Sequence, residues 1–97
     1  MKYNNVMVPD KYKVYAVTRG TYLGEMLIWI ETVGENHCFI SIPKNINRVV
    51  PREKFKFGVE NEILDIADNV PINVYEILRT QYFYNKKHKT NKCTKKM

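Results

Sequence analysis

The sequence predicts an α+β fold in which a three-stranded antiparallel β-meander is followed by two helices and a basic C-terminal tail. Strand-like segments separated by turn residues occupy the first 42 positions, and apolar residues recur at helical spacing in the second half. The last twelve residues carry six Lys and no acid. With 97 residues and 44% hydrophobic content, the chain is long enough for one small domain and too apolar to stay disordered.

Three strands are expected in the first part of the chain. Residues 11–18 alternate between polar and apolar or aromatic side chains, and Tyr, Thr and Val favour an extended backbone. After a short turn, residues 21–32 form a second strand whose apolar side chains fall on both faces, which is typical of a central strand. A third strand over residues 37–42 ends at Pro43.

A first helix is expected to begin at Pro51, which suits the first helical turn because its missing N–H leaves no bond unmade. Four apolar residues then recur at spacings of four, four and three, the pattern of a helix with one buried face: Phe55, Val59, Ile63 and Ile66. Gly58 lies inside this stretch and costs about 1 kcal/mol relative to Ala, so a break or kink is expected there.

A second helix is expected from Pro71 to about residue 86, because no helix breaker interrupts this stretch. Its helical spacing is carried by Val74, Ile77, Leu78, Gln81 and Tyr82. From Phe57 to Leu78 the chain holds five carboxylates and no Lys or Arg. The helical half is therefore expected to present an acidic face.

The net charge of +6 lies entirely at the C-terminus. Residues 1–85 hold ten Lys or Arg and ten Asp or Glu, whereas residues 86–97 hold six Lys and no acid. We therefore expect a single neutral α+β domain over residues 1–85. Residues 86–97 form a Lys-rich tail, either as a flexible arm or as a continuation of the last helix.

The tail and the aromatic residues before it are the strongest candidate for a binding site. A basic block without acids attracts polyanions by neutralising phosphates and releasing counterions. Residues 82–84 are all aromatic, and three consecutive helix positions span about 200°, so at least one ring should be exposed and able to stack on an unpaired base. This pairing favours RNA or single-stranded nucleic acid over duplex. The predicted binding residues are Tyr82, Tyr84, Lys86, Lys87, Lys89, Lys92, Lys95 and Lys96.

Other interpretations of this region stay open. The lysines could form a solvated tail that aids solubility, and the aromatic residues could be packed on both sides of a helix end or form a protein interface. A second basic cluster adds Lys44, Arg48, Arg52, Lys54 and Lys56, with Glu53 the only acid between residues 44 and 56. If this cluster shared a face with the tail, the patch would hold eleven Lys or Arg. The alternative is a surface loop of mixed charge.

No residue pattern predicts a catalytic site, a metal site or a cofactor. His37 and His88 are the only histidines and lie in no metal-ligand or nucleophile motif. His37 and Cys38 are adjacent, so in a strand their side chains point to opposite faces. Cys38 and Cys93 are expected to be free thiols in a reducing compartment. With no apolar run of the roughly 20 residues that span a bilayer and no secretory signal, a cytoplasmic location is expected.

In general character the chain resembles the small early or accessory proteins of T-even-like bacteriophages. The likeness lies in length, in heavy use of Lys, Asn, Ile and Tyr, and in segments such as Val-Pro-Arg-Glu-Lys-Phe at residues 50–55 and Val-Tyr-Glu-Ile-Leu-Arg at residues 74–79. No diagnostic motif matches, so no functional residue is carried over. The resemblance implies a non-enzymatic protein that acts in the host cytoplasm on a host factor, a defence system, a toxin or nucleic acid.

Two functional hypotheses follow. The first is a non-enzymatic regulator that binds RNA or single-stranded nucleic acid through the basic and aromatic C-terminal region, with a host or toxin-type protein as a further partner. The second is a protein-binding inhibitor that uses the sheet or the helical face, with the tail only solubilising or steering. Exposed Trp29, Leu27 or Leu23 would support the second. The open edges of a three-stranded meander also allow a homodimer.

Overall fold

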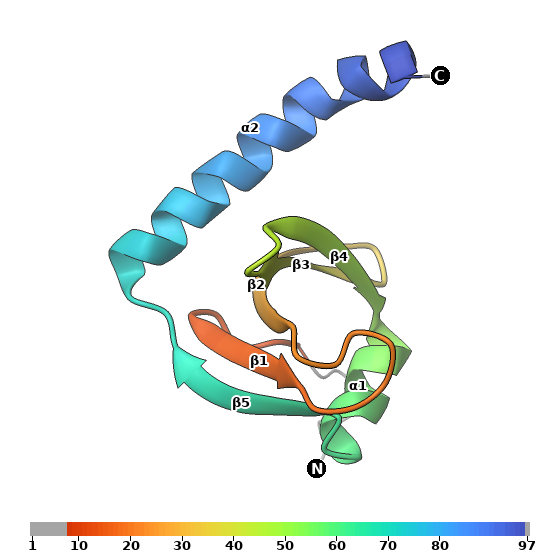
Figure 1. Cartoon of the computed structure of the whole chain (residues 1–97), viewed down its shortest axis with the longest axis vertical. Coiled ribbons are helices and arrows are strands. Elements are labelled where there is room, and N and C mark those ends of the chain that lie inside the picture. The colour runs from red at the N-terminus through yellow and green to blue at the C-terminus, as the bar shows by residue number, and fades with distance from the viewer. Residues whose placement is uncertain (1–7, 97) are drawn as a thin grey trace.

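The structure is a computed structural model that describes residues 8–96, with side chains described as far as Lys87. One antiparallel sheet and two helices make up this part of the chain, in an α+β arrangement (Figure 1). The strands are β1 (Lys13–Val17), β2 (Met26–Val33), β3 (Asn36–Ile42), β4 (Ile46–Pro51) and β5 (Leu64–Asn69), and the helices are α1 (Arg52–Glu60) and α2 (Ile72–Lys96). The strand order in the sheet is β4-β3-β2-β1-β5.

The sheet has five strands rather than the predicted three. The three predicted segments correspond to β1, β2 and β3, and β2 is the central strand, as its apolar residues on both faces indicated. β4 was not predicted, because its Asn and Arg residues resemble a loop, although Arg48 and Val50 are less exposed than the residues on either side of them. β4 pairs with β3, with Arg48 opposite Phe39.

The prediction of a long first helix is wrong beyond Glu60. The chain turns at Asn61, whose side-chain Nδ2 donates to the Phe57 carbonyl at 2.8 Å, and Glu62 has a φ of 59°, which ends the helix. The following residues form β5, which pairs with the open edge of β1, with Leu64 opposite Val17. The spacing of the apolar residues in this segment fits a helix as well as a strand. The segment becomes a strand because the edge of β1 is otherwise unpaired.

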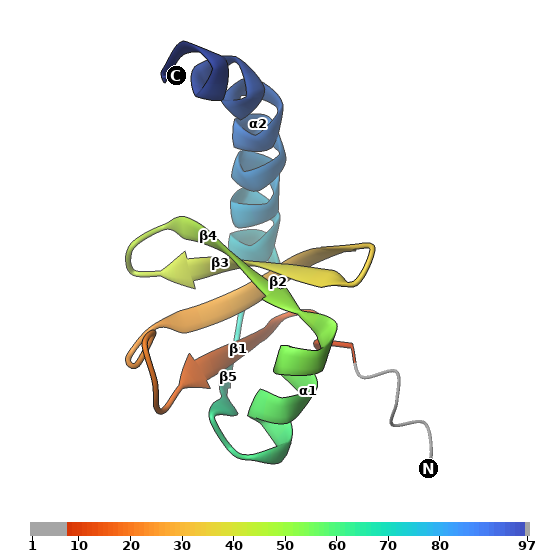
Figure 2. The ribbon, with the colours of Figure 1, turned by 90° about the vertical axis from the view of Figure 1, so that its right-hand side faces the viewer.

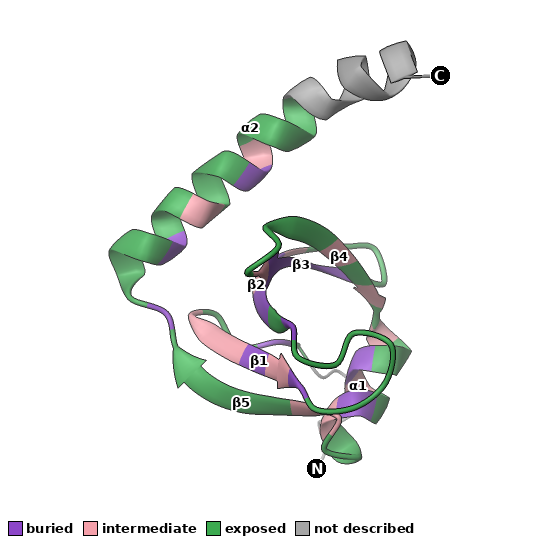
Figure 3. Ribbon diagram, in the orientation of Figure 1, coloured by how far each residue is buried: buried purple, intermediate pink, exposed green. Residues whose placement is uncertain are grey.

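Each face of the sheet is covered by one helix (Figure 2). On one face, Phe55 of α1 is 1% exposed and packs in a cluster with Tyr15, Val17, Leu27 and Phe39. On the other face, α2 contributes Tyr75 and Tyr82 to a second cluster, and Figure 3 shows the buried positions of α2 on the side turned toward the sheet. The strand residues of this second cluster are Ile28, Ile30, Cys38 and Ile40.

The first helix begins after Pro51 as predicted, but Gly58 does not break it. Gly58 is buried against β5, and a Cβ built on it would lie 3.0 Å from Leu64 Cδ1 and 3.1 Å from Leu64 Cγ. The absence of a side chain therefore lets α1 lie close to β5. The second helix begins at Ile72, one residue after Pro71, and continues through Lys96, so residues 86–96 extend the helix and do not form a coil.

We expect Gly58→Ala to destabilise the protein, although the same change in an isolated helix would stabilise it by about 1 kcal/mol. The added methyl would meet Leu64, whose side chain would have to move. Urea unfolding measures the effect. In a Leu64→Ala background the methyl has room, so Gly58→Ala should become stabilising there. A stabilising effect with Leu64 present would contradict the packing explanation.

Candidate functional site

The register of β2 against β3 determines where α2 docks. Trp29 lies opposite Phe39, but Glu31 lies opposite Cys38, so β2 carries one extra residue at this point. Such a bulge changes the face toward which the following side chains point. Glu31 consequently lies on the same face as Cys38, which is the face that α2 covers.

Glu31 is the polar anchor of α2. The Tyr82 hydroxyl donates to Glu31 Oε2 at 3.0 Å, and Lys86 Nζ donates to the same oxygen at 2.6 Å. Burial, the Cys38 thiol and the Glu31 carboxylate raise the pKa of Tyr82 well above its ordinary value. The hydrogen bond to Glu31 also raises the pKa of Lys86. Both side chains are protonated at neutral pH, as Tyr and Lys ordinarily are, and their hydrogen bonds to Glu31 hold α2 on the sheet.

The aromatic residues at positions 82–84 have three different environments. Tyr82 is only 6% exposed and cannot offer a ring face to a base, so its predicted role in stacking is wrong. Phe83 is half-buried, with the Arg79 guanidinium 5.0 Å from its ring centre. Tyr84 is 60% exposed, which confirms that at least one of the three rings lies on the surface. Lys87 is also exposed and lies three positions further along the same helix.

The predicted lysines all lie on α2, whose C-terminal part continues past the sheet (Figures 1 and 2). Lys86 is engaged with Glu31, whereas among the described residues no carboxylate lies within ion-pair distance of Lys87. The side chains of Lys89, Lys92, Lys95 and Lys96, and that of Cys93, lie outside the described part of the structure. Cys38 is a buried free thiol.

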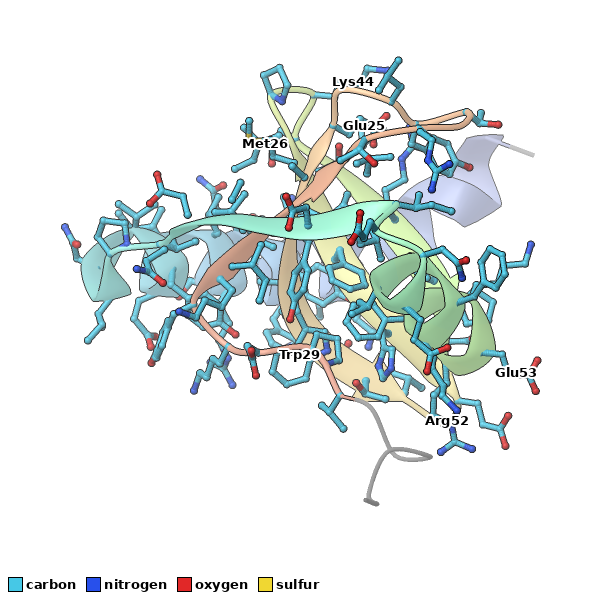
Figure 4. The ribbon with its side chains drawn as sticks, turned by 90° about the horizontal axis from the view of Figure 1, so that it is seen from below. Glu25, Met26, Trp29, Lys44, Arg52 and Glu53 are labelled. Carbon is cyan, nitrogen blue, oxygen red and sulfur yellow. The ribbon has the colours of Figure 1, made fainter. Side chains whose placement is uncertain are left out.

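The second basic cluster does not form one patch. Figure 4 shows Lys44 beside Glu25 at one end of the molecule and Arg52 beside Glu53 at another. Arg52 lies 3.6 Å from the exposed Glu35 carboxylate. Lys54 and Lys56 follow Arg52 on α1. The cluster therefore extends from the β3–β4 turn along β4 to α1, with its charges spread over these elements.

Arg48, one of the predicted binding residues, is used inside the fold. Its Nε donates to Glu25 Oε1 at 3.0 Å and its Nη2 donates to Glu25 Oε2 at 2.7 Å, while Ser41 Oγ donates to Oε1 at 2.7 Å. Lys44 Nζ adds a longer contact of 3.5 Å. Glu25 is only 4% exposed, and the Arg48 and Ser41 hydrogen bonds lower the pKa of its carboxyl group to about 2.

The two basic regions lie on opposite faces of the sheet. Arg48 is opposite Phe39 in the β3–β4 pairing, so its side chain shares the face on which Phe39 packs against α1. Lys54 and Lys56 belong to α1 itself. Lys86 and Lys87 belong to α2, which covers the other face. The two basic regions therefore do not share a face, and the described side chains do not form the joint patch of eleven cations that a shared face would have given.

A cleft on the α1 side was not found by sequence analysis. It has a volume of about 610 Å³ and lies between the β1–β2 turn, the end of β4, α1 and the start of β5. Tyr22 and Phe57 line it and are 46% and 59% exposed. The Arg48 guanidinium lies 4.1 Å from the centre of the Tyr22 ring, an arrangement typical of a cation–π contact. In the sequence, the only indication of this cleft is Phe57, an aromatic residue that lies outside the helical apolar stripe.

The protein-binding hypothesis predicts that Trp29, Leu27 or Leu23 is exposed on an apolar outer face of the sheet. Leu27 is buried at 3% exposure, and Trp29 is half-buried with its Nε1 donating to Thr32 Oγ1 at 3.0 Å. Leu23 is 65% exposed but lies in the turn before β2. None of the three therefore forms an apolar patch on the face of the sheet. The exposed large apolar residues of the described region are spread over several elements: Val8, Tyr22 and Leu23 outside the strands and helices, Met26, Val33, Ile46, Val49 and Ile66 on strands, Phe57 on α1, and Ile72, Val74, Ile77 and Tyr84 on α2.

His37 lies in the core of the domain. His37 is 1% exposed, its Nδ1 lies 2.8 Å from Thr32 Oγ1, and its ring packs edge-on against Phe55. Within residues 8–87, no group of three or more His, Cys, Asp or Glu side chains could hold a metal ion. No helix in the described part of the chain is long and apolar enough to span a membrane.

No protein-family model, no curated protein and no solved structure matches the chain.

We expect Glu25→Gln to lower the free energy of unfolding by about 2 kcal/mol at neutral pH, because Arg48 then loses its buried counter-ion. The folded-state pKa of Glu25, about 2, lies below the ordinary value of 4.5, so this stabilisation is complete above pH 4.5 and is lost as the pH falls toward 2. Urea unfolding of both proteins across this range should show the difference shrinking. Glu53→Gln removes an exposed carboxylate and is the matched control. A difference that does not change with pH would contradict the assignment.

Proposed function

We propose that the protein is a non-enzymatic regulator that binds single-stranded nucleic acid, RNA in the first place, through the C-terminal half of α2. The observation that carries the proposal is that all of the net charge follows the one exposed ring of the aromatic triplet on a single helix. Tyr84 is 60% exposed, Lys87 follows it one turn later, and four more lysines follow without an acid. An exposed ring beside cations suits an unpaired base joined to phosphates.

The position of α2 supports this role. Its N-terminal half is fixed to the sheet through Tyr75 and Tyr82, and Lys86 is fixed through Glu31. The later turns of α2 continue past the sheet (Figure 2). A single strand of nucleic acid could therefore reach this part of the helix without displacing a core contact. Because Lys86 is already paired, five lysines are left to contact phosphates. The remainder of the chain is neutral and offers a polyanion no comparable attraction.

The resemblance to small phage proteins supports a regulatory rather than a catalytic role for such binding. An RNA-binding helix of this kind would act by occupying a host or defence-related RNA, or by bringing the neutral domain to it. The binding itself would be largely independent of base sequence, since phosphate contacts and stacking carry no base code.

Salt dependence tests the phosphate contacts. We expect the full-length protein to bind an oligouridine of about 12 nucleotides, within the usual site sizes of single-strand binders. With five phosphate contacts, log K should fall against log salt with a slope of about −3.5. Replacing Lys87, Lys89, Lys92, Lys95 and Lys96 together by Gln keeps the Lys86–Glu31 pair and should remove most of the slope. Fluorescence anisotropy at about 50 and 200 mM salt measures both. Equal and salt-insensitive binding by the two proteins would overturn the proposal.

Substitution of Tyr84 tests the stacking contact separately. Tyr84→Ala should weaken oligouridine binding by about 1–3 kcal/mol, whereas Tyr84→Phe keeps the ring and should bind as the wild type does. Neither change touches the core, because Tyr84 is exposed. Lys54→Glu alters one charge on α1, on the opposite face of the sheet, and should leave the affinity unchanged. If Tyr84→Ala bound normally, the ring would have no part in recognition.

A further inference from the structure

The cleft on the α1 side is a second surface, separate from the proposed nucleic-acid site. It lies on the face of the sheet that α1 covers, whereas Tyr84 and Lys87 lie on the helix that covers the other face. A nucleic-acid strand bound along α2 would have to pass around an edge of the sheet to reach the cleft. A ligand bound along α2 would therefore leave the cleft open to a different occupant.

The floor of the cleft is aliphatic. Val17 and Leu27 form its base and are buried, while Val50 and Leu64 are half-buried at its sides. Phe57 is 59% exposed beside them. Aliphatic walls favour an apolar side chain and provide few donors or acceptors to recognise the edge of a base. These features favour a protein segment over a nucleotide.

The rim of the cleft is basic. Arg19 and Lys54 line it against one acid, Glu53, and among the described residues neither cation has a carboxylate within ion-pair distance. Next to the rim, Lys44 and Arg48 share the single carboxylate of Glu25, which leaves one positive charge in excess. A partner that placed carboxylates beside its apolar anchor would complement this rim.

The rim is also preorganised. Arg48 is held by two hydrogen bonds to Glu25, and Ser41 holds the same carboxylate from the neighbouring strand. The Arg48 guanidinium in turn lies over the Tyr22 ring at 4.1 Å. One wall of the cleft is thus set before any partner arrives, which reduces the ordering cost of binding.

We propose that this cleft binds an extended segment of a partner protein that carries an aliphatic or aromatic side chain flanked by Asp or Glu. The apolar side chain enters between Tyr22 and Phe57, and the carboxylates lie against Arg19 and Lys54. Together with the helix, this would give the protein two independent binding surfaces, one for nucleic acid and one for an acidic protein segment.

A displayed library of random short peptides tests the proposal with the full-length protein. The library is selected on the wild type after depletion on a Phe57→Ser/Lys54→Glu variant, which has the same basic helix and therefore removes peptides that bind only the lysines. Both changed side chains are exposed, so the variant should fold, as its circular dichroism can show. Selected peptides should combine aliphatic or aromatic residues with Asp or Glu. Their affinity should fall about tenfold or more in the variant, as for a hot-spot contact.

A selected peptide is then mapped by amide chemical shifts on the labelled protein. Shifts centred on Arg19, Tyr22, Lys54 and Phe57, unchanged in Lys87→Glu, would support the proposal. Equal enrichment on the wild type and the cleft variant, or selected peptides without carboxylates, would overturn it. Oligouridine shifting the cleft amides would also overturn it, by assigning the cleft to nucleic acid. Loss of oligouridine binding in Lys87→Glu with peptide binding intact would concern the helix site alone.

Discussion

The central strand β2 is apolar on both faces, and this constraint shapes the rest of the molecule. Ile28 and Ile30 point to one side and Leu27 to the other, so a sheet covered on one face only would leave large apolar side chains in water. The chain provides a different cover for each face. Phe55 of the short helix α1 closes one cluster, and Tyr75 and Tyr82 of the long helix α2 close the other. Because α1 and α2 lie on opposite faces of the sheet, the side chains that each helix exposes to solvent are also separated from one another.

The bulge in β2 gives α2 its polar anchor. Without the extra residue, strict alternation would place Glu31 on the same face as Leu27 and Trp29, below α1. With it, Glu31 meets Tyr82 and Lys86. The first lysine of the basic segment therefore stabilises the fold, while the next, Lys87, is exposed and has no carboxylate of the described residues within ion-pair distance. The Glu31 contacts with Tyr82 and Lys86 fix the helix to the sheet at a point beyond which it continues for ten more residues.

The sequence allowed the fold class, three of the strands and both helix starts to be predicted, because these depend on local patterns: the two-sided apolar pattern of β2, Pro43 after β3, and Pro51 and Pro71 before the helices. It misassigned Ile63 and Ile66, since their spacing fits a helix equally well and only the open edge of β1 decides between the two. In the candidate site, the exposure of one ring among residues 82–84 followed from helix geometry. Which ring it is depends on Glu31, 51 positions from Tyr82, and no local pattern carries that information.

The positions of the buried carboxylate and of the exposed cations explain why counting charge along the sequence misled at residues 44–56. Arg48 and Lys44 contribute to a formal cluster, yet they balance Glu25, whose burial would be costly without them. What they leave at the surface is a modest excess of positive charge next to an aliphatic cleft, which is a poor site for a polyanion and a good one for an apolar side chain beside an acid. Basic residues on the two faces of the sheet are thus suited to different kinds of ligand. On α2 the lysines follow one another without an acid, so the proposed binding of a phosphate chain would rest mainly on charge, with the Tyr84 ring as an added contact. On the α1 face the cations are few, partly paired and set around apolar walls, so shape as well as charge would select the proposed partner.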